Sequence, residues 1–180
     1  YQNQPEKYVE GLYKLGLATL LNLDIPGAAK KPNIRKPPKE NWYKTALPWM
    51  SIGYETQVPP INTLTFYNAI ANDGKMMKPY FIENYQENGT VVKNFGPQEM
   101  SGSICSKETA KEARRALRYV VEVGTGKAAN FAQNVAGKTG TTNDYRDAWF
   151  VGFTPDIVTG VWVGNDNNSK LPGITGGAMP

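Results

Sequence analysis

The sequence contains no histidine among its 180 residues. This absence excludes catalytic sites of the Ser-His-Asp and Cys-His kinds, and it excludes every metal site with a histidine ligand. A general base in this chain must therefore be a lysine or a carboxylate.

Cysteine is almost absent too, because Cys105 is the only one. A single cysteine can form neither an internal disulfide nor a cysteine-cluster zinc site. We expect Cys105 to be a small buried apolar residue.

Long hydrophobic runs are also missing. No run of apolar residues approaches the roughly 18 that a membrane-spanning helix needs, and no signal peptide precedes Tyr1. The chain opens without a methionine, so we expect it to be an excised segment of a longer protein.

The charge and composition are those of an ordinary globular chain. The net charge is +4 and 40% of the residues are hydrophobic, which is enough for one domain or a large piece of one. The lysines and arginines gather in residues 30–44 and 107–118. This charge is too mild to predict nucleic-acid binding, and solvated loops are a simpler interpretation than attraction to an anionic surface.

Helical spacing of apolar residues occurs in three segments. The first begins at Pro5, and its apolar face continues past Gly16 to Leu21. The second covers residues 60–72. The third follows Ser106, a good N-terminal cap, and runs to about residue 123.

Prolines and turn residues separate these helices. Five prolines among residues 23–48 predict an extended loop, although Trp42 and Trp49 argue against a free linker. Residues 80–85 and 90–95 read as strands joined at a tight turn by Asn88 and Gly89.

The last third of the chain predicts a small sheet. Residues 135–142, 148–153 and 157–164 are strand candidates, with a short turn at residues 154–156. An antiparallel meander is the simplest topology, and residues 165–180 read as loop. Together with the helices, this predicts an α+β fold in which helices pack on an antiparallel sheet.

The first of these strands carries Lys-Thr-Gly-Thr-Thr at residues 138–142. Lys-Thr-Gly alone is a weak signal, but the similarity continues through residues 136–156 and 160–164. Together these residues resemble the transpeptidase domain of penicillin-binding proteins. Residues 49–79 and Gly-Thr-Gly at 124–126 also resemble that superfamily: the upstream part is more like the division-type class, and the part from Lys138 onward more like the bifunctional class.

The resemblance implies roles for the five motif residues. Lys138 would hold the substrate carboxylate electrostatically and assist proton transfer. Thr139, Thr141 and Thr142 would bind that carboxylate through their hydroxyls, and Gly140 would leave the edge strand clear for substrate. The backbone N–H of Thr141 would be one of two oxyanion-hole donors, a contribution worth a few kcal/mol.

The same resemblance requires two further motifs, Ser-x-x-Lys and Ser-x-Asn, which supply the nucleophile, its base and a proton shuttle. Neither spacing occurs here: Ser103 and Lys107 are one residue too far apart, and Ser51 lacks the asparagine two positions later. We therefore expect residues 1–180 to be the C-terminal segment of one transpeptidase domain, without these motifs and the closing helix. The isolated chain should be inactive.

For the parent protein, the resemblance implies a serine D,D-transpeptidase of peptidoglycan. It would take an acyl-D-Ala-D-Ala stem peptide, form an acyl-serine intermediate, and be acylated by β-lactams. No metal or organic cofactor and no nucleic acid is implied. The parent should be anchored on the outer face of the bacterial cytoplasmic membrane, on the periplasmic or extracellular side, within a wall-synthesis complex.

Two other functions fit parts of the sequence. Residues 132–139 match a loose phosphate-loop pattern, although no strand precedes them and no convincing helix follows.

A non-catalytic cell-wall-binding or interaction module could instead use the four tryptophans as platforms. We expect Trp149 and Trp162 to be packing residues on adjacent strands. Acylation by a β-lactam would separate binding from catalysis.

Overall fold

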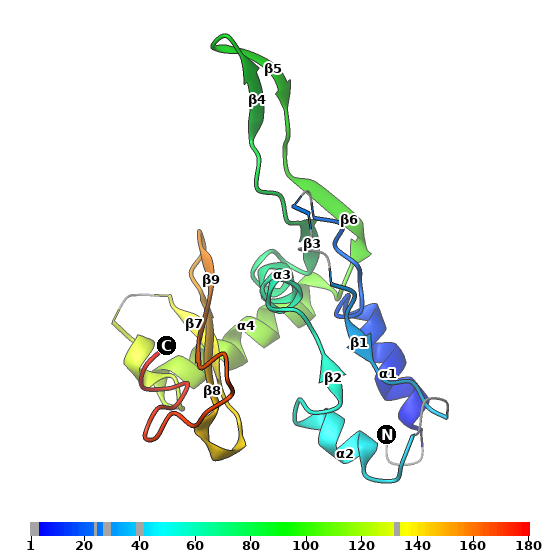
Figure 1. The fold of residues 1–180 in the computed structure, drawn as a ribbon, viewed down its shortest axis with the longest axis vertical. Helices are drawn as coiled ribbons and strands as arrows, with labels where there is room; N and C mark the ends of the chain where they lie inside the picture. Colours follow the sequence, from blue (N-terminus) through cyan, green and yellow to red (C-terminus); the bar gives the residue numbers. More distant parts are fainter. Residues whose placement is uncertain (1–3, 24, 27–29, 39–41, 132–133) are drawn as a thin grey trace. The chain divides into compact units, whose positions relative to one another are not determined.

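The computed structural model describes residues 4–23, 25–26, 30–38, 42–131 and 134–180 (Figure 1). They divide into two compact units. Unit 1 comprises Tyr1–Phe66 and Lys75–Ile104, and unit 2 comprises Tyr67–Gly74 and Cys105–Pro180. The combination of helices with antiparallel sheets confirms the predicted α+β fold class.

Unit 1 begins with helix α1 (Pro5–Lys14), followed by strand β1 (Asn33–Ile34), helix α2 (Ala46–Ser51) and strand β2 (Thr56–Gln57). Strands β1 and β2 pair antiparallel. Buried Val9, Ile34 and Met50 form the core of this part, and Trp42 packs against it. That contact confirms that the proline-rich stretch is not a free linker.

Two predictions about unit 1 are wrong. The first helix does not continue to Leu21, because Gly16 adopts a positive φ of 76° and its backbone lies against Met76. Residues 23–48 are not all loop, because β1 and the first turn of α2 fall within them. Pro48 occupies that first turn, where its missing N–H has no intrahelical partner to lose.

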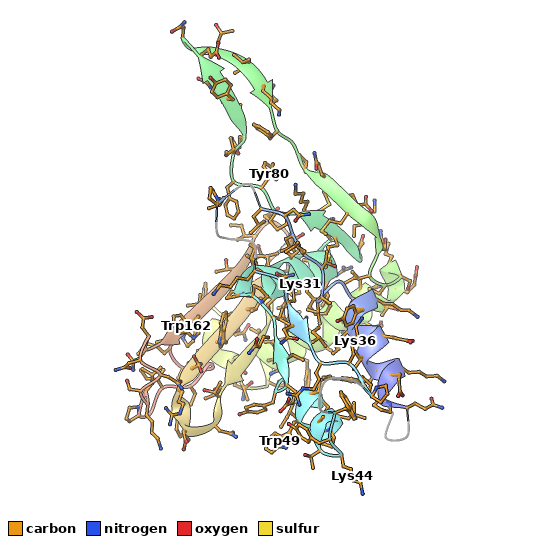
Figure 2. All side chains as sticks on the ribbon, turned by 45° about the vertical axis from the view of Figure 1, so that its right-hand side comes forward. Lys31, Lys36, Lys44, Trp49, Tyr80 and Trp162 are labelled. Carbon is orange, nitrogen blue, oxygen red and sulfur yellow. The ribbon has the colours of Figure 1, made fainter. Side chains whose placement is uncertain are left out.

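The lysines of residues 30–44 that the structure describes are exposed, as a solvated loop requires. Figure 2 labels Lys31, Lys36 and Lys44 among them. The ammonium of Lys36 lies 4.2 Å from the centroid of the Tyr13 ring, a cation–π distance.

The rest of unit 1 is built from two strand pairs. Strand β3 (Lys75–Lys78) pairs antiparallel with β6 (Gln98–Ser103), and β4 (Asn84–Glu87) pairs with β5 (Thr90–Asn94) as an exposed hairpin. Asn88 and Gly89 have φ values of 50° and 78°, which confirms the predicted tight turn. The first hairpin strand begins at Asn84, so its predicted start at Tyr80 is wrong. Pairing of β3 with β6 was not predicted.

Helix α3 (Pro60–Ala71) confirms the second predicted helix and contributes to both units. Gly74 follows it with a φ of 88°. Helix α4 (Lys107–Glu122) confirms the third, and the side chain of Ser106 caps it by accepting a 3.2 Å hydrogen bond from the Thr109 N–H.

The sheet of unit 2 is the predicted antiparallel meander. Strands β7 (Ala136–Thr141), β8 (Asp147–Phe153) and β9 (Val158–Gly164) lie in that order, and α4 lies against β7. The short helices η1 (Lys127–Ala129) and η2 (Asn143–Tyr145) connect these elements. Residues 165–180 contain no helix or strand, as predicted.

The core of unit 2 forms between the helices and the sheet, and Val121 is completely buried there. The prediction that Cys105 is buried is wrong, because it is only half-buried. Trp149 and Trp162 pack on adjacent strands, as predicted, although Trp162, labelled in Figure 2, is 44% exposed. Trp149 is half-buried and faces Trp162 across β8 and β9, with ring centroids 6.4 Å apart. The pair covers one side of the sheet rather than filling a core.

Candidate active-site strand

Strand β7 has one paired edge and one free edge. It pairs residue by residue with β8, and the N–H of Thr142 continues the ladder with a 3.0 Å hydrogen bond to the Asp147 carbonyl oxygen. Because hydrogen-bonded and non-hydrogen-bonded pairs alternate in an antiparallel ladder, the N–H and C=O groups of Thr139 and Thr141 point to the other edge. Within the described residues, no strand pairs with β7 along that edge.

Lys138 lies in the middle of β7 and is exposed. Its Nζ atom donates a 2.7 Å hydrogen bond to the carbonyl oxygen of Thr139, one of the groups at the free edge. A positive charge therefore lies directly at the open side of the strand. The Thr139 oxygen carries no net charge, and among the described residues no carboxylate forms an ion pair with this ammonium.

Thr139 and Thr141 share the face of β7 opposite to Lys138 and Gly140, because successive side chains of a strand alternate. The Oγ1 atom of Thr139 lies 2.7 Å from the Oγ1 atom of Thr125. Thr125 belongs to the turn between α4 and η1, at residues 124–126. The N–H of Gly126 holds this turn by donating to the Val120 carbonyl oxygen at 3.0 Å.

Thr141 is anchored by the C-terminal segment. Its Oγ1 atom accepts a 3.0 Å hydrogen bond from the N–H of Gly176. Gly176 is buried, and an added Cβ would overlap the carbonyl oxygens of Gly140 and Trp149. The absence of a side chain at Gly176 therefore allows the segment to lie directly on the sheet at this point.

Thr142 has a different environment. Its Oγ1 atom accepts a 2.8 Å hydrogen bond from the Asp147 N–H and donates one of 3.2 Å to Asp147 Oδ2. The Nε1–H of Trp162 donates to the other carboxylate oxygen at 3.0 Å. The Thr142 hydroxyl therefore closes the turn that joins β7 to β8, and its assignment to substrate binding stays a prediction.

The structure thus brings together four of the five predicted residues, Lys138, Thr139, Gly140 and Thr141, along one strand. Sequence reasoning did not assign Thr125 or Gly176 to this site. The sequence features that could have pointed to them are the two glycines on either side of Thr125 and the Gly-Gly pair that begins at Gly176. Neither signal specifies which strand the segment will contact.

The phosphate-loop interpretation is wrong for the residues that the structure describes. Lys138 and Thr139 lie inside strand β7, whereas a phosphate loop would place them at the start of a helix. Among the described residues, no group of three or more cysteines, aspartates and glutamates is arranged to hold a metal ion.

In the part of the chain that the structure describes, no helix combines the length and apolar character that crossing a membrane requires.

Comparison with known proteins agrees with this geometry. A family profile described as the penicillin binding protein transpeptidase domain matches residues 1–173. Penicillin-binding protein 1A of Aquifex aeolicus is 42% identical over 127 residues, which cover 69% of this chain and 17% of that protein. Penicillin-binding protein 4 of Bacillus subtilis is 34% identical over 121 residues, or 66% of this chain and 19% of that protein.

Solved structures have the same fold. Penicillin-binding protein 3 of Mycobacterium tuberculosis, crystallised with aztreonam, superimposes with a TM-score of 0.76 and 26% identity, over 96% of this chain and 43% of that one. The D,D-transpeptidase domain of a peptidoglycan glycosyltransferase from Eggerthella lenta superimposes with a TM-score of 0.68 and 28% identity. The match covers 84% of this chain and 40% of that one. This chain therefore spans less than half of each compared protein. Because the profile covers nearly all of it, the chain belongs to the family of penicillin-binding protein transpeptidase domains.

Proposed function

We propose that this chain provides the substrate-carboxylate side of the active site in a peptidoglycan D,D-transpeptidase. The observation that carries the proposal is the pair Thr139 and Thr141. Their hydroxyls lie on one face of a free-edge strand, each within hydrogen-bond distance of a fixed partner. Lys138 adds a positive charge at the same edge.

The Thr141 hydroxyl accepts a hydrogen bond from its partner, the Gly176 N–H. A hydroxyl group has one proton to donate and two lone pairs to accept with. The Gly176 N–H uses a lone pair of Thr141 Oγ1, so this bond does not use the Thr141 proton. An ionised carboxylate only accepts hydrogen bonds, and bonds to a charged group are about twice as strong as neutral ones. The C-terminal carboxylate of a D-Ala-D-Ala peptide fits this donor.

The free edge of β7 supplies a second kind of donor. The Thr141 N–H points away from β8 and into the open side of the strand. A substrate lying along this edge would bring its reacting carbonyl oxygen to that N–H. We assign the Thr141 N–H as one oxyanion donor, a role worth about 3 to 4 kcal/mol in enzymes where such a donor has been removed.

Lys138 contributes electrostatically. Its ammonium attracts the substrate carboxylate and stabilises the negative charge that develops on the reacting oxygen. Close to an attacking serine, it would also lower the cost of removing the serine proton. Gly140, two residues further along the strand, puts no side chain in the path of the substrate.

The reaction needs a serine from outside this chain, in a Ser-x-x-Lys motif of the complete protein. The serine oxygen attacks the carbonyl carbon of the penultimate D-alanine, and the bond to the terminal D-alanine breaks. The departing amine takes up the serine proton through the site's base. An amine of a neighbouring stem peptide then attacks the carbonyl carbon of the acyl-serine ester, and the bond from that carbon to the serine oxygen breaks. The proton lost by the amine passes through the site's base to the serine oxygen.

In this proposal, residues 1–180 are the C-terminal segment of one transpeptidase domain. The complete protein would act on peptidoglycan stem peptides, react with β-lactams, and work on the outer face of the cytoplasmic membrane within a wall-synthesis complex. The relatives named penicillin-binding proteins support this proposal.

Intact mass spectrometry after incubation with a β-lactam tests it. We expect an adduct of the mass of the β-lactam on the complete protein and none on the 180-residue chain. No adduct on either protein would refute the transpeptidase proposal. Binding of the chain to isolated cell walls without acylation would then favour the non-catalytic wall-binding module.

The role of Lys138 has its own test in the complete protein. We expect Lys138→Ala to lower the acylation rate by at least about tenfold, since tenfold in rate corresponds to about 1.4 kcal/mol of lost stabilisation. Lys111→Ala removes another exposed lysine of unit 2, on α4, and should change the rate by less than about twofold. An equal rate in the Lys138→Ala protein would remove the assigned role.

A further inference from the structure

We propose that Thr125 is a positioning residue of the carboxylate site, which holds the Thr139 hydroxyl and polarises it toward the substrate. The inference rests on the proposed function and extends it to a residue outside the strand motif. It assigns a chemical task to the turn that follows α4.

The contact between the two threonines has the geometry of a good hydrogen bond. Their Oγ1 atoms are 2.7 Å apart, the usual distance for an O–H···O bond. The two residues belong to different elements, because Thr125 lies in the turn after α4 and Thr139 lies within β7. The bond therefore joins the turn directly to the strand that binds substrate.

The hydrogen bond between Thr125 and Thr139 can form with either hydroxyl as the donor. If Thr125 donates, Thr139 has used a lone pair and its own proton is free; if Thr139 donates, the Thr125 proton is free instead. In both arrangements the pair presents one unused proton. A carboxylate on the Thr139 face selects the first arrangement, because Thr139 can then donate to the anion while it accepts from Thr125. Hydrogen bonds in such a chain polarise and strengthen one another.

The backbone around Thr125 is held on two sides. Gly124 and Gly126 pack against Val120, and a Cβ added to Gly124 would lie 2.8 Å from the Val120 carbonyl oxygen. On the other side, a Cβ added to Gly177 would overlap the carbonyl oxygen of Thr125. This close packing keeps the hydroxyl at a defined position before substrate arrives, which is what a preorganised site requires.

A purely structural hydrogen bond is the alternative, and it makes a different prediction. A structural bond would stabilise the turn whatever ligand is present. A positioning bond matters only when a carboxylate occupies the site. The discriminating measurement therefore compares a ligand that carries the carboxylate with the same ligand in which the carboxylate is blocked.

The test uses the complete protein and its second-order rate of acylation. One β-lactam is used as the free acid and as the methyl ester of its ring carboxylate. We expect Thr125→Val, which keeps the shape and removes the hydroxyl, to lower the free-acid rate about five- to tenfold and the ester rate by no more than about twofold. Thr125→Ser restores the hydroxyl and should restore most of the free-acid rate.

Three outcomes overturn the inference while the proposed function stands: an unchanged free-acid rate in Thr125→Val, equal losses for acid and ester, or no recovery in Thr125→Ser. Thr139→Val separates the two proposals. If it leaves the free-acid rate unchanged, the carboxylate site itself is wrongly assigned. Thermal unfolding of each variant checks the fold, and Thr125→Ala is measured in the same way if Thr125→Val does not fold.

Discussion

Gly176 lies so close to the sheet that an added methyl group would overlap the carbonyl oxygens of Gly140 and Trp149. That contact brings the Gly176 N–H to the hydroxyl of Thr141. The absence of a side chain at Gly176 thus allows this hydrogen bond to form. The environment of the Thr141 hydroxyl thus depends on a backbone group 35 residues further along the chain.

Gly176→Ala should therefore impair the site. We expect the methyl group to lift the segment from β7, release the Thr141 hydroxyl, and lower the acylation rate of the complete protein by about fivefold or more. The measurement is the same β-lactam acylation rate. Gly96→Ala is the control, because a Cβ at Gly96 meets no atom within 4 Å. Equal rates for wild type and Gly176→Ala would contradict this account of Thr141.

At the scale of the element, α4 connects the capped turn at Ser106 to the turn that carries Thr125. Its start is stabilised by Ser106, whose side chain satisfies the Thr109 N–H. Such caps satisfy backbone groups that the helix itself leaves unpaired. The same helix thus depends on local hydrogen bonding at its start and ends just before the turn that carries Thr125.

Ser106→Ala should loosen the first turn of α4, at a cost of about 1 kcal/mol. Hydrogen–deuterium exchange of peptides covering residues 106–112 measures this change directly. Ser106→Asp keeps a side-chain acceptor at the same position and should retain the protection. Equal exchange in wild type and Ser106→Ala would mean that the cap contributes nothing to the helix.

A second contact of α4 responds to pH. Arg114 reaches the end of α3, where it donates to the Ile70 carbonyl oxygen and to Asp73 Oδ1, both at 2.7 Å. Lys107 lies 3.0 Å from the other carboxylate oxygen of Asp73. Hydrogen bonds from Lys107 and then Arg114 lower the pKa of Asp73 below its ordinary value of 3.8.

The direction of that pKa shift gives a pH dependence. A lowered pKa means that folding favours the carboxylate, so the stabilisation is present above about pH 4 and is lost as the pH falls through the lowered pKa. We expect Asp73→Asn to lower the thermal unfolding temperature at pH 7, and we expect the difference from wild type to shrink below pH 4. Asp166→Asn, at an exposed position, is the control. A difference that does not change with pH would contradict the assignment.

At the scale of the whole molecule, the chain exposes a large amount of apolar surface. In unit 2, a groove of about 520 Å³ is lined largely by apolar side chains. Phe131 and Ile157 in its lining are 86% and 64% exposed. A groove with a largely apolar lining can bind an apolar ligand.

This surface should bind an apolar dye. We expect the 180-residue chain to enhance the fluorescence of anilinonaphthalene sulfonate, and we expect Ile157→Lys to reduce the enhancement by about half, because a charge in the groove disfavours apolar binding. Ile52→Lys is the matched control, because Ile52 is 68% exposed and lies outside the groove. Equal reductions in both variants would show that the dye does not prefer the groove.

Local patterns were sufficient to predict most of the elements. Short strand-like segments bounded by turn residues predicted β7, β8 and β9. Helical spacing predicted α3 and α4, because this signal follows from the period of the helix. The hairpin turn followed from Asn88 and Gly89, which tolerate positive φ. Strands β3 and β6 were missed because their pairing joins segments about 25 residues apart and short strands carry little periodic signal.

The sequence by itself determined the family and the residues of the strand motif, because these are linear patterns that survive without coordinates. It also indicated the end of α3, because Gly74 follows that helix with a backbone angle that other residues resist. Only the tertiary structure decided that Thr125 meets Thr139 and that Gly176 meets Thr141. Those contacts depend on how a turn and a loop pack against one face of β7, and no local period in the sequence encodes that packing.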